Sequence, residues 1–146
     1  MAVEALVGIA HVALKVADIQ RSLDFYRDRL GFAEMMRLND DSGNLWLIYL
    51  RITDTQYLEL FPGGHGDVAP GPERTAVNHF CLETRDLATT AASLRAAGIA
   101  LTVEPQMGLD HNKQCWFEDP DGNRIEVMQM SPHSMQSEAI RRLNAA

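Results

Sequence analysis

The chain has 146 residues, of which 46% are hydrophobic and 23% are charged, a balance typical of a globular protein. Its formal net charge of −7, with Lys and Arg scattered, excludes a nucleic-acid partner, because binding a phosphate backbone requires clustered positive charge. No apolar segment approaches the roughly 18–20 residues that cross a bilayer, and Glu4 stands where a secretory signal carries positive charge. We therefore expect a cytoplasmic protein without a membrane-spanning segment.

A short strand followed by an amphipathic helix is predicted within residues 9–32. Asp18 can cap the start of the helix, and Gly31 stands where a left-handed C-terminal cap is required. Between them, four apolar residues at spacings of four, three and four share one helical face, namely Ile19, Leu23, Tyr26 and Leu30.

The same combination recurs within residues 77–99, where Asp86 is the cap and Gly98 the terminator. The interval from His11 to His79 equals the interval between the two capping aspartates. The interval between the two terminal glycines is shorter by a single position, which one deletion in the second helix would explain. We infer that the two halves are copies of one supersecondary unit.

Three further strands are predicted after each helix. In the first half they cover residues 32–38, 44–52 and 55–61, and in the second half residues 99–104, 113–118 and 123–130. Each half is then a βαβββ module, and the predicted fold class is α+β, with two such modules in tandem.

The chain is expected to form a single two-module domain over residues 1–146. Module 1 covers about residues 8–61 and module 2 about residues 76–130, and a linker rich in Pro and Gly joins them at residues 62–75. The tail, residues 131–146, is predicted to contain a short amphipathic helix.

One histidine and one glutamate of each copy are predicted to face away from the helix of their module, because alternate strand residues point to opposite faces. They are His11 and Glu59 in the first copy, and His79 and Glu126 in the second. Taken singly, a strand histidine more often forms an ordinary hydrogen bond, and an exposed glutamate is usually solvated. The recurrence of the pair at copied positions favours a metal site instead.

Two imidazoles and two carboxylates suit a divalent ion such as Ni, Zn, Co, Mn or Fe better than Cu(I) or an iron–sulfur cluster. Four protein ligands on a six-coordinate ion leave two adjacent positions open. A substrate with two neighbouring oxygens could occupy both.

Residues 8–130 resemble the vicinal oxygen chelate superfamily, which includes glyoxalase I, methylmalonyl-CoA epimerase, extradiol dioxygenases, and the fosfomycin and bleomycin resistance proteins. The segments that carry the resemblance are HVALKVADIQRSLDFYRDRLGF, YLELF, VNHFCLET and FEDPDGNRIEVMQ. The resemblance implies a glyoxalase/dioxygenase-like fold with curled sheets around a metal cleft, a small-molecule substrate and a homodimer.

The order His, Glu, His, Glu resembles that of bacterial glyoxalase I (lactoylglutathione lyase). It implies isomerisation of a 2-oxoaldehyde–thiol hemithioacetal to a 2-hydroxyacyl thioester, through an enediolate whose vicinal oxygens bind the metal. Glu126 would be the general base, and Glu59 is the second candidate. At the two positions where bacterial glyoxalase I usually has arginine and asparagine for glutathione, this chain has Lys15 and Gly63.

Further residues are candidates for contact with substrate. Lys15 keeps the positive charge of the family's arginine. Tyr57 and Met128 share a strand face with Glu59 and Glu126 and are expected in the cleft wall, and His111 lies in a loop that could flank it.

Three other residues have alternatives that the sequence leaves open. Cys81 could be a soft metal ligand or a reactive thiol. A cysteine at such a position is more often a small space-filling residue. Trp46 and Trp116 fall on predicted strands, where we expect them to be core residues rather than stacking platforms.

Two other function classes remain open. One is a metal-dependent epimerase or Fe(II) dioxygenase of the same superfamily, which would show proton exchange at a substrate α-carbon or oxygen uptake with iron. The other is a metal-free protein that binds an antibiotic, which would hold no stoichiometric metal.

Overall fold

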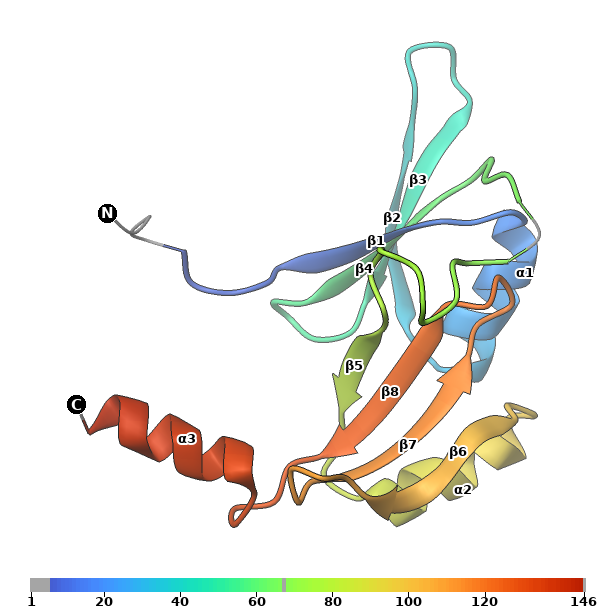
Figure 1. The fold of residues 1–146 in the computed structure, drawn as a ribbon. Helices are drawn as coiled ribbons and strands as arrows, with labels where there is room; N and C mark the ends of the chain where they lie inside the picture. The colour runs from blue at the N-terminus through green and yellow to red at the C-terminus, as the bar shows by residue number, and fades with distance from the viewer. Residues whose placement is uncertain (1–5, 67, 146) are drawn as a thin grey trace. The chain divides into compact units, whose positions relative to one another are not determined.

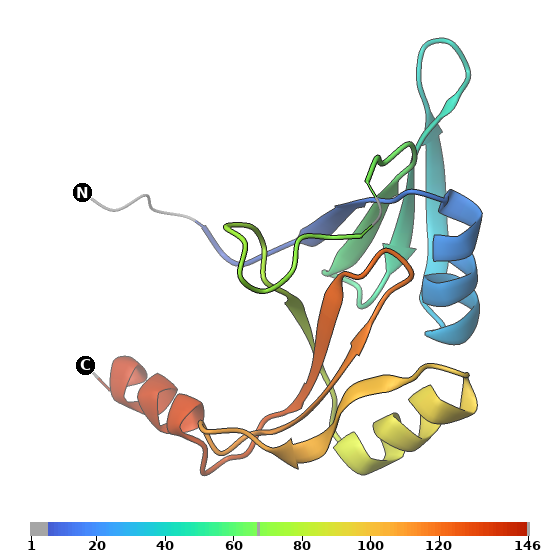
Figure 2. The same cartoon turned by 45° about the vertical axis from the view of Figure 1, so that its right-hand side comes forward.

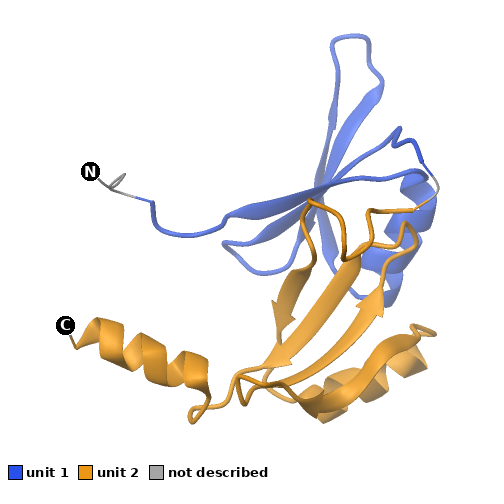
Figure 3. Ribbon diagram, in the orientation of Figure 1, with its two compact units in different colours: residues 1–67 blue, residues 68–146 orange. Residues whose placement is uncertain are grey.

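The structure, a computed structural model, describes residues 6–66 and 68–145, so Glu4 lies outside the described residues. The chain divides into two compact units, residues 1–67 and 68–146 (Figure 3). Each unit contains a four-stranded sheet. Among the described residues, no helix is both long enough and apolar enough to cross a membrane.

Unit 1 is a βαβββ module, with a helix connecting the two edge strands of its sheet (Figure 1). The strand order is β1-β4-β3-β2, in which β1 and β4 are parallel and the other neighbours are antiparallel. The strands are β1 (His11–Lys15), β2 (Ala33–Asn39), β3 (Leu45–Arg51) and β4 (Tyr57–Phe61).

Unit 2 repeats this topology, with the order β5-β8-β7-β6 and a parallel β5–β8 pair. The agreement in strand order confirms the α+β class and the two βαβββ modules predicted from the internal repeat. The strands are β5 (Phe80–Glu83), β6 (Leu101–Met107), β7 (Lys113–Glu118) and β8 (Arg124–Gln129).

The helical segment of unit 1 is not a regular α-helix throughout. α1 (Ile19–Leu23), capped by Asp18, passes into a π-helical segment, η1 (Asp24–Arg29), in which the Leu30 N–H donates to the Phe25 carbonyl at 3.0 Å. A π-turn accommodates one extra residue in a helix. The first copy has one more residue than the second between its capping aspartate and its terminal glycine, and the wider turn accommodates it.

In unit 2 the corresponding helix, α2 (Leu87–Ala96), is α-helical along its whole length. Asp86 caps it by accepting hydrogen bonds from the N–H groups of Ala88 and Thr89. α2 packs on its own sheet, contacting β6, β7 and β8 (Figure 2).

Each unit buries apolar side chains between its helix and its sheet. Strand alternation accounts for most of these positions, because Leu58 and Leu60, and likewise Ile125 and Val127, are two residues apart and fully or nearly fully buried. Each unit therefore has a hydrophobic core of its own.

The C-terminal helix α3 (Met135–Asn144) begins at Ser134, whose hydroxyl accepts from the Ser137 N–H. This confirms the helix predicted in the tail. None of its residues is buried, and the apolar side chains of Met135, Ile140 and Leu143 are exposed.

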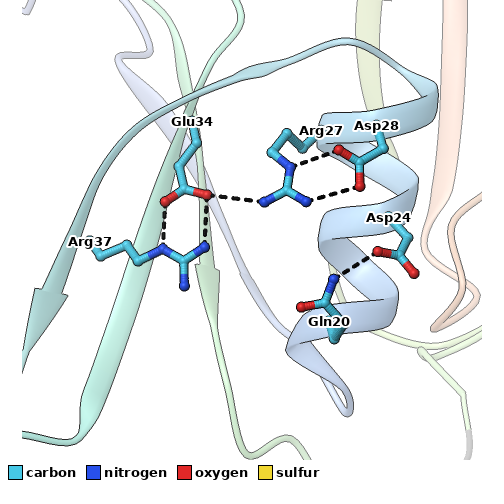
Figure 4. A network of polar contacts seen from close by, with 6 residues as sticks. All are labelled: Gln20, Asp24, Arg27, Asp28, Glu34 and Arg37. Carbon is cyan, nitrogen blue, oxygen red and sulfur yellow. Dashed lines mark hydrogen bonds and ion pairs between the residues drawn. The ribbon is translucent and has the colours of Figure 1, made fainter.

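A polar network connects the π-helical segment to the edge strand β2 (Figure 4). Glu34 on β2 accepts two hydrogen bonds from Arg37, at 2.5 and 2.9 Å, and lies 3.4 Å from Arg27 of η1. Arg27 also pairs with Asp28 at 2.8 Å. The network holds the end of the helical segment next to the strand that follows it.

Candidate functional site

In unit 1, the strand pair β1–β4 brings His11 and Glu59 together. Their Nε2 and Oε2 atoms are 3.6 Å apart, and the Glu59 side chain is 7% exposed against 48% for His11. Tyr49 is the register partner of Glu59 on β3, and the Glu59 carboxylate is the main influence on its phenol. The carboxylate as hydrogen-bond acceptor, together with burial and the carboxylate charge, raises the pKa of Tyr49 above its ordinary value, so the phenol remains a donor.

In unit 2, His79 and Glu126 form the corresponding pair. Nε2 of His79 is 3.2 Å from Oε2 of Glu126, and their side chains are 33% and 15% exposed. Cys81 is the register partner of Glu126 on β5. Partial burial of its sulfur, followed by the charge of Glu126 and a hydrogen bond to it, raises the pKa of the Cys81 thiol to about 12. The thiol is therefore protonated near neutral pH, which does not favour a reactive thiolate.

The two pairs occupy equivalent positions in their sheets. Glu59 is paired with Ala13 on one side and Tyr49 on the other. Glu126 is paired with Cys81 and Trp116 in the same way. Each glutamate is on an inner strand, with an aromatic register partner on one side and, on the other, a strand that begins at its histidine or directly after it.

The donor atoms of each pair fit a shared divalent ion. Metal–ligand bonds of about 2.0–2.2 Å allow two ligands on one ion to be separated by up to about 4 Å. The Nε2–Oε2 distances of 3.6 and 3.2 Å fall within this limit, and both residue types bind divalent transition metals. In residues 6–66 and 68–145, no three His, Cys, Asp or Glu side chains gather as a metal site, so the structure shows each histidine–glutamate pair by itself.

Besides Glu126, the His79 ring has polar and aromatic neighbours. Its Nδ1 is 2.8 Å from Oδ1 of Asn78, and its ring packs edge-on against Trp116 with the centroids 4.7 Å apart. The guanidinium of Arg124 donates to the same Asn78 oxygen at 3.0 Å and lies over the Trp116 ring at 4.8 Å. These contacts place three residues of unit 2, Asn78, Trp116 and Arg124, around the His79 imidazole.

The residues predicted to contact substrate differ from one another in exposure and in hydrogen-bond partners. Lys15 is exposed and donates to the Pro62 carbonyl at 2.6 Å, and the Tyr57 hydroxyl donates to the Asp54 carbonyl at 2.6 Å. Met128 is half-buried on β8, two residues beyond Glu126. His111 is exposed, with a φ of 66° in the turn after Gly108.

The expectation that Trp46 is a core residue is wrong, since it is 53% exposed. β4 pairs with β3 only over Ile48–Arg51, so Trp46 lies in the two-stranded end of the β2–β3 hairpin. Trp116 is half-buried, and Cys81 is exposed as a residue although its sulfur lies beside Glu126.

Tyr49, Asn78 and Arg124 were not among the residues predicted for the site. The repeat contains a signal for the first of these, because the interval from Tyr49 to Trp116 equals that from Glu59 to Glu126. Asn78 has no such signal, since the equivalent residue in the first copy is Ala10.

A known protein family matches most of the chain. Residues 8–127 match the sequence profile of the Glyoxalase/Bleomycin resistance protein/Dioxygenase superfamily. The chain belongs to this superfamily. The match includes both histidine–glutamate pairs and both βαβββ modules.

Several named members of the glyoxalase superfamily are similar to the chain over most of its length. It is 29% identical to the lactoylglutathione lyase of Haemophilus influenzae, covering 83% of this chain and 91% of the relative. It is 28% identical to a probable lactoylglutathione lyase of Vibrio cholerae, with coverage of 83% and 89%. An ethylmalonyl-CoA/methylmalonyl-CoA epimerase of Cereibacter sphaeroides is 26% identical, with coverage of 82% and 96%.

Solved structures of the superfamily share the fold. A glyoxalase family protein from Enterococcus faecalis aligns with a TM-score of 0.72 at 25% identity, covering 83% of this chain and 96% of that protein. An antibiotic-binding protein from Streptomyces aligns with a TM-score of 0.64 at 24% identity, covering 87% and 98%. The fold is thus common to proteins with different functions.

Proposed function

We propose that the protein is a metal-dependent lyase/isomerase of the glyoxalase I type, acting on the hemithioacetal of a 2-oxoaldehyde and a thiol. The observation that carries this proposal is the recurrence of one histidine–glutamate pair in both modules, with Nε2–Oε2 distances of 3.6 and 3.2 Å. The lactoylglutathione lyases among its relatives support it.

The ligands of the proposed metal are His11, Glu59, His79 and Glu126. The ion would be one of Ni, Zn, Co, Mn or Fe, because imidazole and carboxylate ligands suit all five. When bound, it would supply Lewis-acid stabilisation to the negative charge that develops on two neighbouring substrate oxygens.

Glu126 is the proposed general base, which removes a proton from one substrate carbon and returns it to the next. Glu59 faces the phenol of Tyr49, whereas Glu126 faces the thiol of Cys81. A thiol is a weaker donor than a phenol, so it competes less for the carboxylate lone pairs that accept the substrate proton. This difference favours Glu126 as the base and leaves Glu59 as the second candidate.

The substrate is proposed to contact Lys15, Tyr57, His111 and Met128. The Lys15 ammonium already donates to the Pro62 carbonyl, and the next residue is Gly63, which has no side chain to offer a glutathione carboxylate. A single ammonium also lacks the two-pronged geometry of arginine. We therefore propose a thiol other than glutathione as a substrate to be tested alongside it.

The proposed function is tested with the wild type, Glu126→Gln, and the matched control Glu118→Gln, whose glutamate is exposed at the end of the neighbouring strand β7. Elemental analysis should find about one ion per chain in the wild type and the control, and less in Glu126→Gln. Thioester formation from hemithioacetals should fall about 10²–10⁴-fold in Glu126→Gln only. Failure of the wild type to take up any metal would contradict the proposal and favour a metal-free, antibiotic-binding protein.

A second candidate is an epimerase, which the relative from Cereibacter sphaeroides supports. An epimerase also removes and returns a proton next to a carbonyl group, and it would use the same two carboxylates. Exchange of the α-proton of an acyl thioester with deuterated water, without any turnover of hemithioacetals, would select this candidate. Oxygen uptake with Fe(II) would select a dioxygenase.

We also propose that the protein is a cytoplasmic homodimer, as the family resemblance implies. Light scattering coupled to size-exclusion chromatography measures the oligomeric state directly. A mass of one chain, 16.3 kDa, would contradict the dimer.

A further inference from the structure

The orientation of the Asn78 side-chain amide is determined by two neighbours. Its oxygen accepts from the Arg124 guanidinium at 3.0 Å, and its nitrogen is 3.4 Å from the Pro72 carbonyl oxygen. A guanidinium has only donors and a carbonyl oxygen only accepts. Exchanging the amide oxygen and nitrogen would place two donors together and two acceptors together, so Oδ1 must face Arg124.

This orientation requires a hydrogen on Nδ1 of the His79 ring. Oδ1 of Asn78 is also 2.8 Å from Nδ1 of His79, and an amide oxygen can only accept, so Nδ1 must carry a hydrogen. In the neutral imidazole the lone pair is then on Nε2. Nε2 is the atom that lies 3.2 Å from the Glu126 carboxylate, so two electron-pair donors face each other and a cation between them is favourable.

The plane of the His79 ring is also held. Trp116 contacts it edge-on, with the ring planes at 67° and the centroids 4.7 Å apart. Arg124 lies over the Trp116 ring and donates to Asn78, so one guanidinium supports both neighbours of the imidazole. The position and the tautomer of His79 therefore depend on the same small group of residues.

The first module lacks this arrangement. The residues equivalent to Asn78 and Arg124 are Ala10 and Tyr57, and neither can orient an imidazole through an amide. The His11 side chain is correspondingly more exposed, at 48% against 33% for His79. The two histidines are thus chemically unequal although their strands are copies.

We propose that Asn78, oriented by Arg124, is a positioning residue that fixes His79 as the Nδ1–H tautomer and so presents Nε2 to a divalent cation. This inference rests on the proposed metal function. His79 is the prearranged imidazole ligand, whereas the position equivalent to Asn78 beside His11 is Ala10, which has no amide to orient the ring. Partners that orient a ligating histidine in this way typically contribute about 10–100-fold to metal affinity.

The test compares four proteins: wild type, Asn78→Ala, Asn78→Asp, and the control Asn39→Ala, which removes an exposed amide on β2. Asn78→Asp keeps an acceptor oxygen beside Nδ1 and beside Arg124, so it serves as the conservative rescue. Long-range ¹H–¹⁵N spectra of the metal-free proteins report the tautomer of His79. They are recorded at pH about 8.5, where an ordinary imidazole is neutral. Titration with Zn²⁺ reports affinity.

We expect the Nδ1–H tautomer at His79 in the wild type, the control and Asn78→Asp, and a mixture of tautomers in Asn78→Ala. The affinity for Zn²⁺ should be about 10–100-fold lower in Asn78→Ala than in the wild type. In Asn78→Asp it should be close to that of the wild type. An Nε2–H tautomer in the wild type, or an Asn78→Ala protein with unchanged tautomer and affinity, would overturn the inference. A wild type that binds no Zn²⁺ would contradict the proposed function, and the ring spectra alone would then decide the positioning role.

Discussion

Tyr49 lies beside the candidate metal site without being one of the proposed ligands. It is the register partner of Glu59 on β3, and Glu59 raises the pKa of its phenol, so we expect it to act on the proposed metal through that carboxylate. Hydrogen bonds to a ligating carboxylate hold its orientation and are part of what determines metal affinity. We therefore predict that Tyr49 positions Glu59 in the first module, as Asn78 is proposed to position His79 in the second.

We predict that Tyr49→Phe weakens the binding of a divalent metal by about 10-fold, because Glu59 loses the donor that orients it. The matched control is Tyr57→Phe, which removes a hydroxyl that donates to the Asp54 carbonyl instead. Calorimetric titration of both variants measures the effect. Equal affinities for the two variants would show that the phenol does not orient Glu59.

At the residue scale, strand alternation predicted which side chains share a face but not what each one contacts. The pairs His11–Glu59 and His79–Glu126 follow from period-two strands and the repeat. The pairing of Tyr49 with Glu59 does not, because it depends on the register between β3 and β4, which the sequence leaves undetermined.

At the scale of single elements, the Glu34 network connects η1 to β2 through charged groups. Hydrogen bonds from Arg37, and secondarily from Arg27, lower the pKa of the Glu34 carboxyl below its ordinary value of 4.5. A group whose pKa is lower in the folded state contributes stability above its unfolded pKa. That contribution is lost as the pH falls through the folded pKa.

We predict that Glu34→Gln lowers the free energy of unfolding at pH 7 by about 0.2–1 kcal/mol, the range for pairs that are partly exposed. The difference from wild type should begin to shrink below about pH 4.5, where the unfolded carboxyl takes up a proton, and should disappear once the pH is below the lowered pKa of the folded carboxyl. Urea unfolding at several pH values tests this, with Glu73→Gln, an exposed glutamate, as control. If the difference in free energy of unfolding between Glu34→Gln and the wild type did not depend on pH, the effect would come from packing and not from charge.

The elements themselves were largely predictable, and the errors have physical causes. The strand predicted to end at residue 104 continues to Met107 in β6, through Pro105. A proline is tolerated there because β6 is an edge strand and its pairing with β7 shifts register between Val103 and Gln106. Edge position is a property of the assembled sheet, so a local sequence pattern cannot reveal it.

At the scale of the whole molecule, the two units provide a test of whether one ion is held by both histidine–glutamate pairs. The chain contains two tryptophans, of which Trp46 belongs to unit 1 and Trp116 to unit 2. Trp46→Phe leaves Trp116, whose fluorescence reports on unit 2, and the difference between this variant and the wild type reports on unit 1 through Trp46.

We predict that divalent metal raises the unfolding midpoint of both units. A ligand that binds only the folded state stabilises it by about 2.7 kcal/mol at a free concentration about 100-fold above its dissociation constant. Because the four proposed ligands come from both units, the shift should appear at both tryptophans and be lost at both in Glu126→Gln. A shift confined to one tryptophan would show that a single histidine–glutamate pair binds the ion.

The π-turn in unit 1 has a consequence for how the two halves could diverge after duplication. An insertion in a regular α-helix rotates all that follows by about 100°, but here the added residue is confined to η1. The helical segment leads from β1 to β2, which lie at opposite edges of the sheet, whereas the histidine and the glutamate are on the adjacent strands β1 and β4. A change in helix length is thus absorbed between β1 and the far edge strand β2, so each half can gain or lose residues there without moving its histidine and glutamate out of register.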